Sequence, residues 1–271
     1  MIKNQTHFTD FNSEGFFKLQ LFNSEEVLAL NNIISEYKSH ENGISFNGLL
    51  YSLFNLNSDL SLELSRKLKK QLDPFLNRLF SNFDSLVYSY IKKETSTTNE
   101  FEYHQDWSYT NKKKHFTVTG WLALQDIDEK NGCLFFKKPF IDHKNIVSST
   151  YQTLRFNSSN FKEIETTKVP LKKGEIIFFN PQAFHGSQPN TSGTSRAVIT
   201  FIIKPKDAPF LYYQKINNFL GKSFEISEQY LMENIAQLSS GKTPSNNLKN
   251  HYFFYNYKSN IQKIKNQFNL L

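Results

Sequence analysis

Two stretches in the first third of the chain carry apolar residues at the three- and four-residue spacing of an amphipathic helix. The first follows Asn23, which can cap a helix together with Glu26, and its apolar positions are Val27, Leu30, Ile34 and Tyr37. The second begins at Ser58 and places apolar side chains at Leu60, Leu64, Leu68 and Leu72. Pro74 is expected to end or kink this helix, with a short further helix over residues 75–80. Both stretches predict helices that bury one face against a neighbouring layer.

From residue 86 onwards the pattern changes to short apolar runs without helical periodicity. These runs predict strands at residues 86–91, 101–107, 116–124, 133–136, 175–179 and 196–203. Successive strands with no helix between them argue against a parallel α/β sheet and favour a sandwich or barrel. We therefore expect a mainly β protein with flanking helices, forming a single domain over residues 1–271. Its parts would be N-terminal helices in 1–85, a β core in 86–205 and a C-terminal extension in 206–271.

Two further segments have less definite roles. Residues 142–169 are rich in Ser, Thr and Asn, which predicts a long insertion or a lid over a substrate. The C-terminal extension contains a predicted helix near 225–238 and could serve substrate entry or a dimer contact. The sequence leaves that choice, and the oligomeric state, open.

Composition and charge narrow the cellular context. The formal net charge is +7, but the lysines are scattered in short clusters, so we expect a solvated surface and no nucleic-acid partner. The single cysteine, Cys133, excludes an internal disulfide framework and a cysteine-rich zinc site, and fits a reducing compartment. The first residues lack the apolar run of a signal peptide, and no run of about 18 apolar residues is present. These features predict a cytoplasmic protein outside the membrane.

The candidate chemistry lies in two stretches that are far apart in the sequence. His104 and Asp106 stand two positions apart in a predicted strand, so both side chains point to one face and can hold one ion. His185 adds a second imidazole, and two histidines with one carboxylate suit a non-haem Fe(II) with open coordination positions. Arg196 follows His185 by eleven residues and opens an apolar run. Together the two stretches form a more specific pattern than either forms alone.

These residues resemble the pattern of the phytanoyl-CoA dioxygenase family of Fe(II)/2-oxoglutarate-dependent oxygenases. In that family a His-Gln-Asp stretch is followed by Asn-Gly-x-Leu, and then by His-Gly-Ser with an arginine eleven residues after that histidine. The corresponding residues here are His104-Gln105-Asp106, Asn131-Gly132-Cys133-Leu134 and His185-Gly186-Ser187 with Arg196. The resemblance extends from about residue 86 to residue 203, and more weakly over the N-terminal helices.

The resemblance implies a double-stranded β-helix, or jelly-roll, whose two histidines and carboxylate hold Fe(II). It also implies 2-oxoglutarate as cosubstrate and dioxygen as co-reactant. Arg196 would hold the distal carboxylate of 2-oxoglutarate, because a guanidinium fork matches a carboxylate bidentately and stays charged when enclosed. Ser187 would donate a second hydrogen bond to the same group. Gln105 is assigned to the cosubstrate region too, although in an ideal strand it points away from its neighbours and could brace them instead.

Several other residues are weaker candidates. Lys92 or Lys93, in the strand before the first motif, is a candidate for holding substrate or cosubstrate. Trp107, Tyr109 and Trp121 could line a substrate pocket, but aromatic residues in a barrel more often form core, and we interpret them as core.

The sequence thus predicts an oxygenase that converts 2-oxoglutarate to succinate and CO2 and hydroxylates a C–H bond of a small or carrier-linked metabolite. Desaturation and cyclisation remain open, whereas halogenation is disfavoured because halogenases of this family replace the carboxylate ligand and Asp106 is present. The alternatives are a non-catalytic jelly-roll that binds a metal or ligand, and a zinc hydrolase with the same ligands. The hydrolase would give Arg196 no role. The second substrate is left undetermined, because function depends on the site rather than on the fold.

Overall fold

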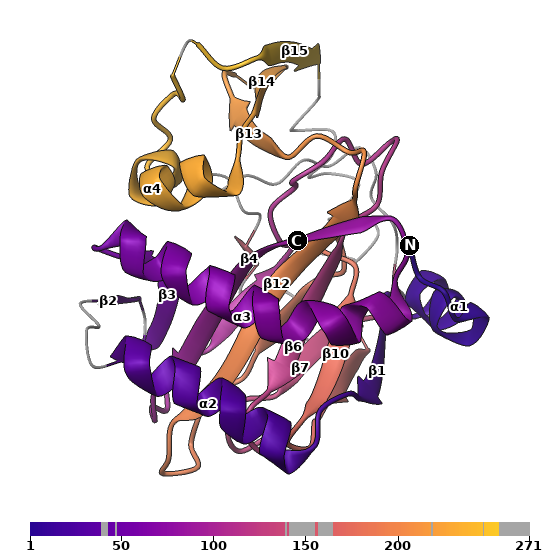
Figure 1. The fold of residues 1–271 in the computed structure, drawn as a ribbon, viewed down its shortest axis with the longest axis vertical. Coiled ribbons are helices and arrows are strands. Elements are labelled where there is room, and N and C mark those ends of the chain that lie inside the picture. Colours follow the sequence, from indigo (N-terminus) through magenta and orange to yellow (C-terminus); the bar gives the residue numbers. More distant parts are fainter. Residues whose placement is uncertain are drawn as a thin grey trace.

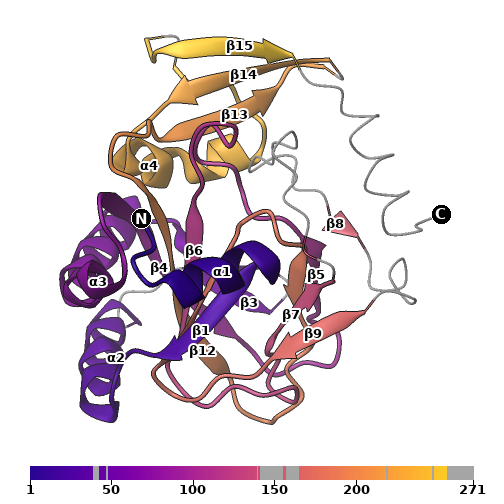
Figure 2. The same cartoon turned by 90° about the vertical axis from the view of Figure 1, so that its right-hand side faces the viewer.

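The short apolar runs form the strands of two antiparallel sheets that lie face to face, as the computed structural model of the chain shows (Figures 1 and 2). The structure describes residues 1–38, 43–46, 48–138, 140, 155–156, 165–217, 219–245 and 247–254. The larger sheet has seven strands in the order β1-β10-β6-β12-β4-β3-β2. Their bounds are β1 Phe16–Gln20, β2 Gly43–Phe46, β3 Leu49–Asn55, β4 Phe83–Lys93, β6 Val118–Ala123, β10 Glu175–Phe179 and β12 Arg196–Pro205.

The smaller sheet has five strands in the order β8-β5-β11-β7-β9. Their bounds are β5 Phe101–His104, β7 Leu134–Lys137, β8 Arg155–Phe156, β9 Thr166–Val169 and β11 His185–Ser187. A cluster of buried side chains from both sheets fills part of the space between them, including Trp121, Phe136, Phe179 and Val198. This is the predicted mainly β, jelly-roll architecture with flanking helices.

The first 85 residues contribute strands as well as helices, which the sequence pattern did not indicate. β1, β2 and β3 all belong to the seven-stranded sheet, and β1 pairs along its whole length with β10, so that Phe16 lies opposite Phe179. These strands are short, and β1 and β3 pair with strands that lie further along the chain, whereas β2 pairs only with the neighbouring β3. Local sequence alone therefore gives them little signal.

α2 and α3 lie against the outer face of the larger sheet, and α1 lies at its edge beside β1 (Figures 1 and 2). α1 spans Gln5–Ser13, α2 spans Ser24–Lys38 and α3 spans Ser58–Leu79. The apolar stripes predicted for α2 and α3 are buried there in one cluster with sheet residues such as Tyr88, Leu122 and Phe178. Burial of these two stripes fixes the helices on the sheet.

The expected break at Pro74 is wrong: α3 continues through Pro74 to Leu79 as one helix. Leu72 and Leu76 stand on either side of the proline and are both fully buried against the sheet. Each buried leucine contributes about 1.5–3 kcal/mol, which together offset the roughly 3 kcal/mol that an interior proline costs. Tertiary packing therefore overrides the local preference.

Pro74→Ala is expected to increase the free energy of unfolding by about 1–2 kcal/mol, because it restores an N–H donor within α3 and relieves the ring's clash with the preceding turn. The side chain of Pro74 is exposed, so alanine leaves no cavity. Urea denaturation of the two proteins measures the difference. An unchanged or lower midpoint would show that the helix already accommodates the proline without cost.

The C-terminal extension forms a separate layer above the sheets (Figure 1). Its three-stranded antiparallel sheet consists of β13 Leu211–Lys215, β14 Leu220–Glu225 and β15 Asn250–Phe254, and α4 spans Glu228–Ser239 close to the predicted helix. Buried residues of this layer pack with Leu53 of β3 and Val87 of β4. Most of the predicted insertion at 142–169 lies outside the described residues. None of the helices in the described ranges combines the length and hydrophobicity needed for a membrane span.

Candidate active site

Strand pairing brings the two remote histidines together. His104 is the last residue of β5, His185 is the first of β11, and the two lie directly opposite each other in this antiparallel pair. Asp106 lies just beyond β5, because the strand predicted over 101–107 ends at His104. The backbone N–H of Asp106 instead donates to the carbonyl of Pro181 at 2.8 Å. The carboxylate is thus positioned by the irregular segment that follows β5, and not by the alternation of side chains along a strand.

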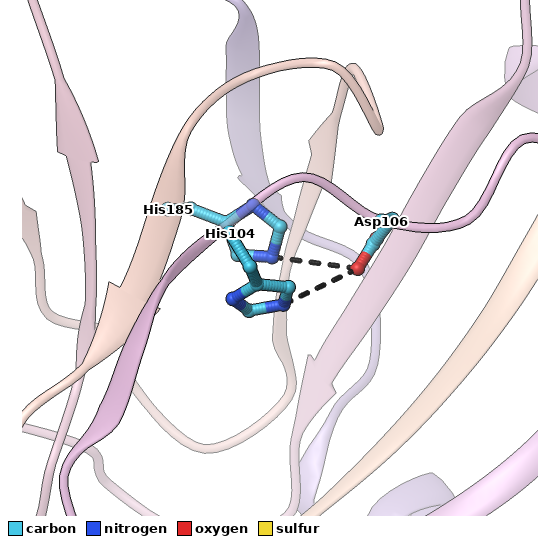
Figure 3. Close-up of side chains that lie close together, drawn as sticks. All are labelled: His104, Asp106 and His185. Atoms are coloured by element: carbon cyan, nitrogen blue, oxygen red, sulfur yellow. Dashed lines mark ion pairs between the residues drawn. The ribbon is translucent and has the colours of Figure 1, made fainter. Parts of the chain in front are cut away.

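The three side chains converge on one point (Figure 3). Oδ1 of Asp106 lies 3.6 Å from Nε2 of His104 and 3.6 Å from Nε2 of His185. One ligand atom from each residue lies within 4.8 Å of the other two, and the described ranges contain no other such group of three. A metal with bonds of about 2.0–2.2 Å holds neighbouring ligand atoms roughly 3–3.5 Å apart. The spacing therefore suits a single ion held by all three residues.

Backbone hydrogen bonds fix the tautomer of both imidazoles. Nδ1 of His104 lies 2.8 Å from the carbonyl of Glu102, and Nδ1 of His185 lies 2.9 Å from the carbonyl of Ala183. Since a carbonyl only accepts, both Nδ1 atoms carry the proton, and the lone pairs on Nε2 face Asp106. Burial, with some help from His104, lowers the pKa of His185 to about 4. His185 is therefore neutral at physiological pH, as a metal ligand must be.

Asp106 is held in its charged form by its neighbours. Burial by itself would raise the pKa of this carboxyl, but His185, His104 and a hydrogen bond from Thr119 lower it below its ordinary value. Oγ1 of Thr119 donates to Oδ2 at 2.8 Å, which leaves Oδ1 facing the histidines. Thr119 was not a sequence candidate. Its only signal was its position in the predicted strand at 116–124, two residues before Trp121.

Arg196 is buried and lines the same cavity as His104, Asp106 and His185, which together are called the metal-ligand group. It is the first residue of β12, and its guanidinium lies 4.8 Å from the centre of the Trp121 ring. Nη2 donates to the carbonyl of Gly132 at 2.9 Å, whereas Nε has no hydrogen-bond partner among the described residues. Gly132 has φ +84°, and a Cβ there would lie 2.5 Å from the carbonyl oxygen of Gln188. The Asn-Gly stretch therefore needs its glycine to bring this carbonyl to the arginine.

Lys93 is a second buried cation at the same place. It lies opposite Arg196 in the β4–β12 ladder, and Nζ donates to Oγ of Ser187 at 2.8 Å and to the carbonyl of Gln188. Burial lowers the pKa of Lys93 to about 7, and the nearby Arg196 acts in the same direction. The Ser187 hydroxyl accepts from Lys93 and so keeps its own hydrogen to donate. Of the two sequence candidates, Lys92 is half-buried and pairs with Glu94, whereas Lys93 is the one that lies beside Arg196.

A cavity of about 460 Å³ joins His104, Asp106 and His185 to Arg196, and Lys93 is not among its lining residues. The three potential ligands, Ser187 and Arg196 line it, and so do the aromatic residues that we interpreted as core. Trp107, Tyr109 and Trp121 also belong to or pack against the hydrophobic clusters, so that interpretation was incomplete. In a barrel that encloses a cavity, the side chains that point inward serve both roles.

Gln105 does not line the cavity and instead supports a neighbouring segment of the chain. Its side chain is fully buried, and Nε2 donates to the carbonyl of Gln182 at 2.6 Å. Gln182 lies three residues before His185. Gln105 therefore supports the segment that delivers the second histidine, and it lies outside the cavity in which a cosubstrate would bind.

Comparison with known proteins gives the family. The model of the phytanoyl-CoA dioxygenase family matches residues 57–198, which is more than half of the chain. The chain belongs to the phytanoyl-CoA dioxygenase family. A curated member, the phytanoyl-CoA dioxygenase domain-containing protein 1 homolog of Dictyostelium discoideum, is 28% identical over 137 residues, covering 45% of this chain and 47% of that protein. The matched region spans less than half the length of the curated relatives.

Solved structures agree on the architecture. The non-heme alpha ketoglutarate dependent carbocyclase SnoK from nogalamycin biosynthesis superposes with a TM-score of 0.60 at 16% identity, over 93% of this chain and 96% of that one. The epimerase SnoN, in complex with Fe3+, alpha ketoglutarate and nogalamycin RO, superposes with a TM-score of 0.58 at 15% identity, over 76% and 85%. At such identities the similarity establishes the fold. It confirms the predicted jelly-roll class, and the family match confirms the predicted family.

Proposed function

We propose that this protein is an Fe(II)- and 2-oxoglutarate-dependent oxygenase that hydroxylates a C–H bond of a small or carrier-linked metabolite. The observation that carries the proposal is the content of one buried cavity. It joins a convergent set of two histidines and a carboxylate to the buried guanidinium of Arg196. The buried Lys93 lies outside the lining and donates a hydrogen bond to Ser187, which lines the cavity.

The donor set fits Fe(II). Two neutral imidazole nitrogens and one carboxylate oxygen, from His104, His185 and Asp106, suit non-haem Fe(II) and leave coordination positions open for other ligands. When bound, Fe(II) supplies the redox chemistry that couples the oxidative decarboxylation of 2-oxoglutarate to the hydroxylation of a C–H bond by dioxygen. The chain's own part is to hold the ligand atoms in place, with Thr119 and the two backbone carbonyls as supports.

The paired cations favour a dicarboxylate cosubstrate. Among the described residues, no carboxylate lies within ion-pair distance of Lys93 or Arg196, and both side chains are almost fully buried. Burying unpaired charge is unfavourable, so an anion bound here would offset part of that cost. The free Nε of Arg196 and the hydroxyl hydrogen of Ser187 are suitable donors for a carboxylate. A zinc hydrolase would leave this charge without a purpose. The complex of SnoN with Fe3+ and alpha ketoglutarate is consistent with the same chemistry on this fold.

The decisive experiment follows succinate formation. Protein purified without oxygen is given Fe(II), 2-oxoglutarate and then air, and wild type is compared with His104→Ala. We expect slow succinate release without any second substrate, and its loss in His104→Ala and on addition of a chelator. His251→Ala, which removes an exposed histidine of β15, is the matched control and should behave as wild type. If anaerobic titration shows that the wild type binds neither Fe(II) nor 2-oxoglutarate, the proposal fails.

A further inference from the structure

Part of the cavity wall comes from outside the segment that matches the family. Tyr51 and Phe54 precede the matched residues, and Ser239 lies beyond them at the end of α4, in the C-terminal extension. The metal-ligand group and Arg196, by contrast, all lie within the matched segment. The layer that carries Ser239 is therefore the place to look for the substrate class.

The extension is anchored to the cavity wall by its own helix. Oε1 of Glu228, the first residue of α4, accepts a hydrogen bond from Oγ of Ser65 at 2.8 Å and from the backbone N–H of Val87 at 2.6 Å. Val87 lines the cavity and has φ +57°, a left-handed conformation that a β-branched residue rarely adopts. The carboxylate of Glu228 thus holds a strained bulge of β4 in place. This contact fixes α4 relative to the cavity, and Ser239 lies at the other end of the same helix.

The wall contributed by these elements is aromatic and uncharged. Tyr51 contacts Phe54 edge-on with ring centres 5.6 Å apart, Phe54 contacts Trp107 at 6.3 Å, and Trp107 contacts Tyr109 at 6.2 Å. Apart from the metal-ligand group and Arg196, no charged side chain is found among the described residues that line the cavity. A phosphate or carboxylate on the second substrate would find no counter-charge along this wall. An apolar ring system would fit it.

Ser239 adds a hydroxyl to this wall. Oγ of Ser239 is buried and has no hydrogen-bond partner among the described residues. A serine in a helix usually bonds a carbonyl of the preceding turn. The next residue does so: Oγ of Ser240 donates to the carbonyl of Gln237 at 2.8 Å. The carbonyl of Leu238 already accepts from Tyr212. A buried hydroxyl without a partner is unfavourable, and at a cavity wall a ligand can supply the partner.

We propose that the second substrate is an uncharged, largely apolar ring system, and that its hydrogen-bonding group meets Ser239. The C-terminal extension then acts as a specificity element, with Ser239 as a substrate-binding residue and Glu228 as a positioning residue. The inference rests on the proposed function for the identity of this pocket as the substrate site. It makes a separate claim about binding, which requires neither iron nor turnover.

The test uses 1-adamantanol, an uncharged alicyclic alcohol, and adamantane-1-carboxylate as its charged counterpart. Trp107 and Trp121 are the two tryptophans of the chain and both line the cavity, so intrinsic tryptophan fluorescence reports its occupancy. We expect the alcohol to bind wild type and Ser240→Ala with the same Kd. In Ser239→Ala its Kd should rise about five- to tenfold, which corresponds to the loss of one hydrogen bond. Ser239→Leu, which fills the site, should abolish the response.

Adamantane-1-carboxylate tests whether the cavity rejects a charged ligand of similar shape. It is titrated against wild type and against Arg196→Met, because any carboxylate binding at Arg196 disappears in that variant. We expect the carboxylate to bind Arg196→Met at least tenfold more weakly than the alcohol does. The proposal is overturned if wild type does not respond to the alcohol, if Ser239→Ala leaves its Kd unchanged, or if the carboxylate binds Arg196→Met as tightly as the alcohol. Since these titrations use the full chain without iron, they are independent of the succinate assay.

Discussion

Asp106→Asn is expected to weaken Fe(II) binding at least about a hundredfold and to abolish succinate formation. The substitution keeps the size of the side chain and leaves Thr119 able to donate, but it removes the negative charge that faces the two histidines. Residues that merely orient a ligand contribute about 10- to 100-fold to metal affinity, and a ligand itself contributes more. Anaerobic Fe(II) titration and the succinate assay measure the two effects.

The matched control is Asp207→Asn, which removes one negative charge from an exposed position. It should bind Fe(II) as wild type does. Retention of tight Fe(II) binding by Asp106→Asn would mean that the ion is held elsewhere. If the wild type binds Fe(II) but forms no succinate, even with a broad panel of second substrates, the alternative of a non-catalytic jelly-roll is favoured.

Lys93→Met is expected to have opposite effects on stability and on 2-oxoglutarate binding. The pKa of Lys93 is lowered from its ordinary value to about 7 by burial, so the folded protein binds fewer protons than the unfolded chain between about pH 7 and pH 10. The resulting penalty is fully present below pH 7, and the free energy of unfolding should rise as pH rises through that window. Lys93→Met removes the penalty, and at pH 7 we expect a gain of about 1–3 kcal/mol after the lost hydrogen bonds are counted.

The same substitution should raise the Kd for 2-oxoglutarate about tenfold or more, because it removes the positive charge beside Arg196 and the donor that orients the Ser187 hydroxyl, and both of these residues line the cavity. Urea denaturation at several pH values and anaerobic titration with 2-oxoglutarate measure the two effects. Lys92→Met is the control: that side chain is half-buried, pairs with Glu94 and should change neither quantity by much. Equal behaviour of the two variants, or a rise of stability with pH that is as large in Lys93→Met as in the wild type, would refute the role given to Lys93.

The sequence alone determined the chemically distinctive residues of the site. His104, Asp106, His185 and Arg196 were identified from their types and spacing, and the structure brings all four to one cavity. These residues are recognisable because their types and spacing match the pattern of the family. The apolar stripes of α2 and α3 were also predicted, since helical periodicity is a property of the local sequence.

Other features were decided only when strands from distant parts of the chain came together. The register of β4 against β12 places Lys93, and not Lys92, beside Arg196. The burial of α3 on the sheet carries the helix through Pro74. The cavity wall combines aromatic side chains from near residue 50 and near residue 107 with Ser239. None of these residues has an unusual local sequence, because their roles depend on which remote side chains surround them. The sequence therefore indicated the candidate metal ligands and Arg196, whereas tertiary packing determined which side chains surround them and which side chains form the cavity wall.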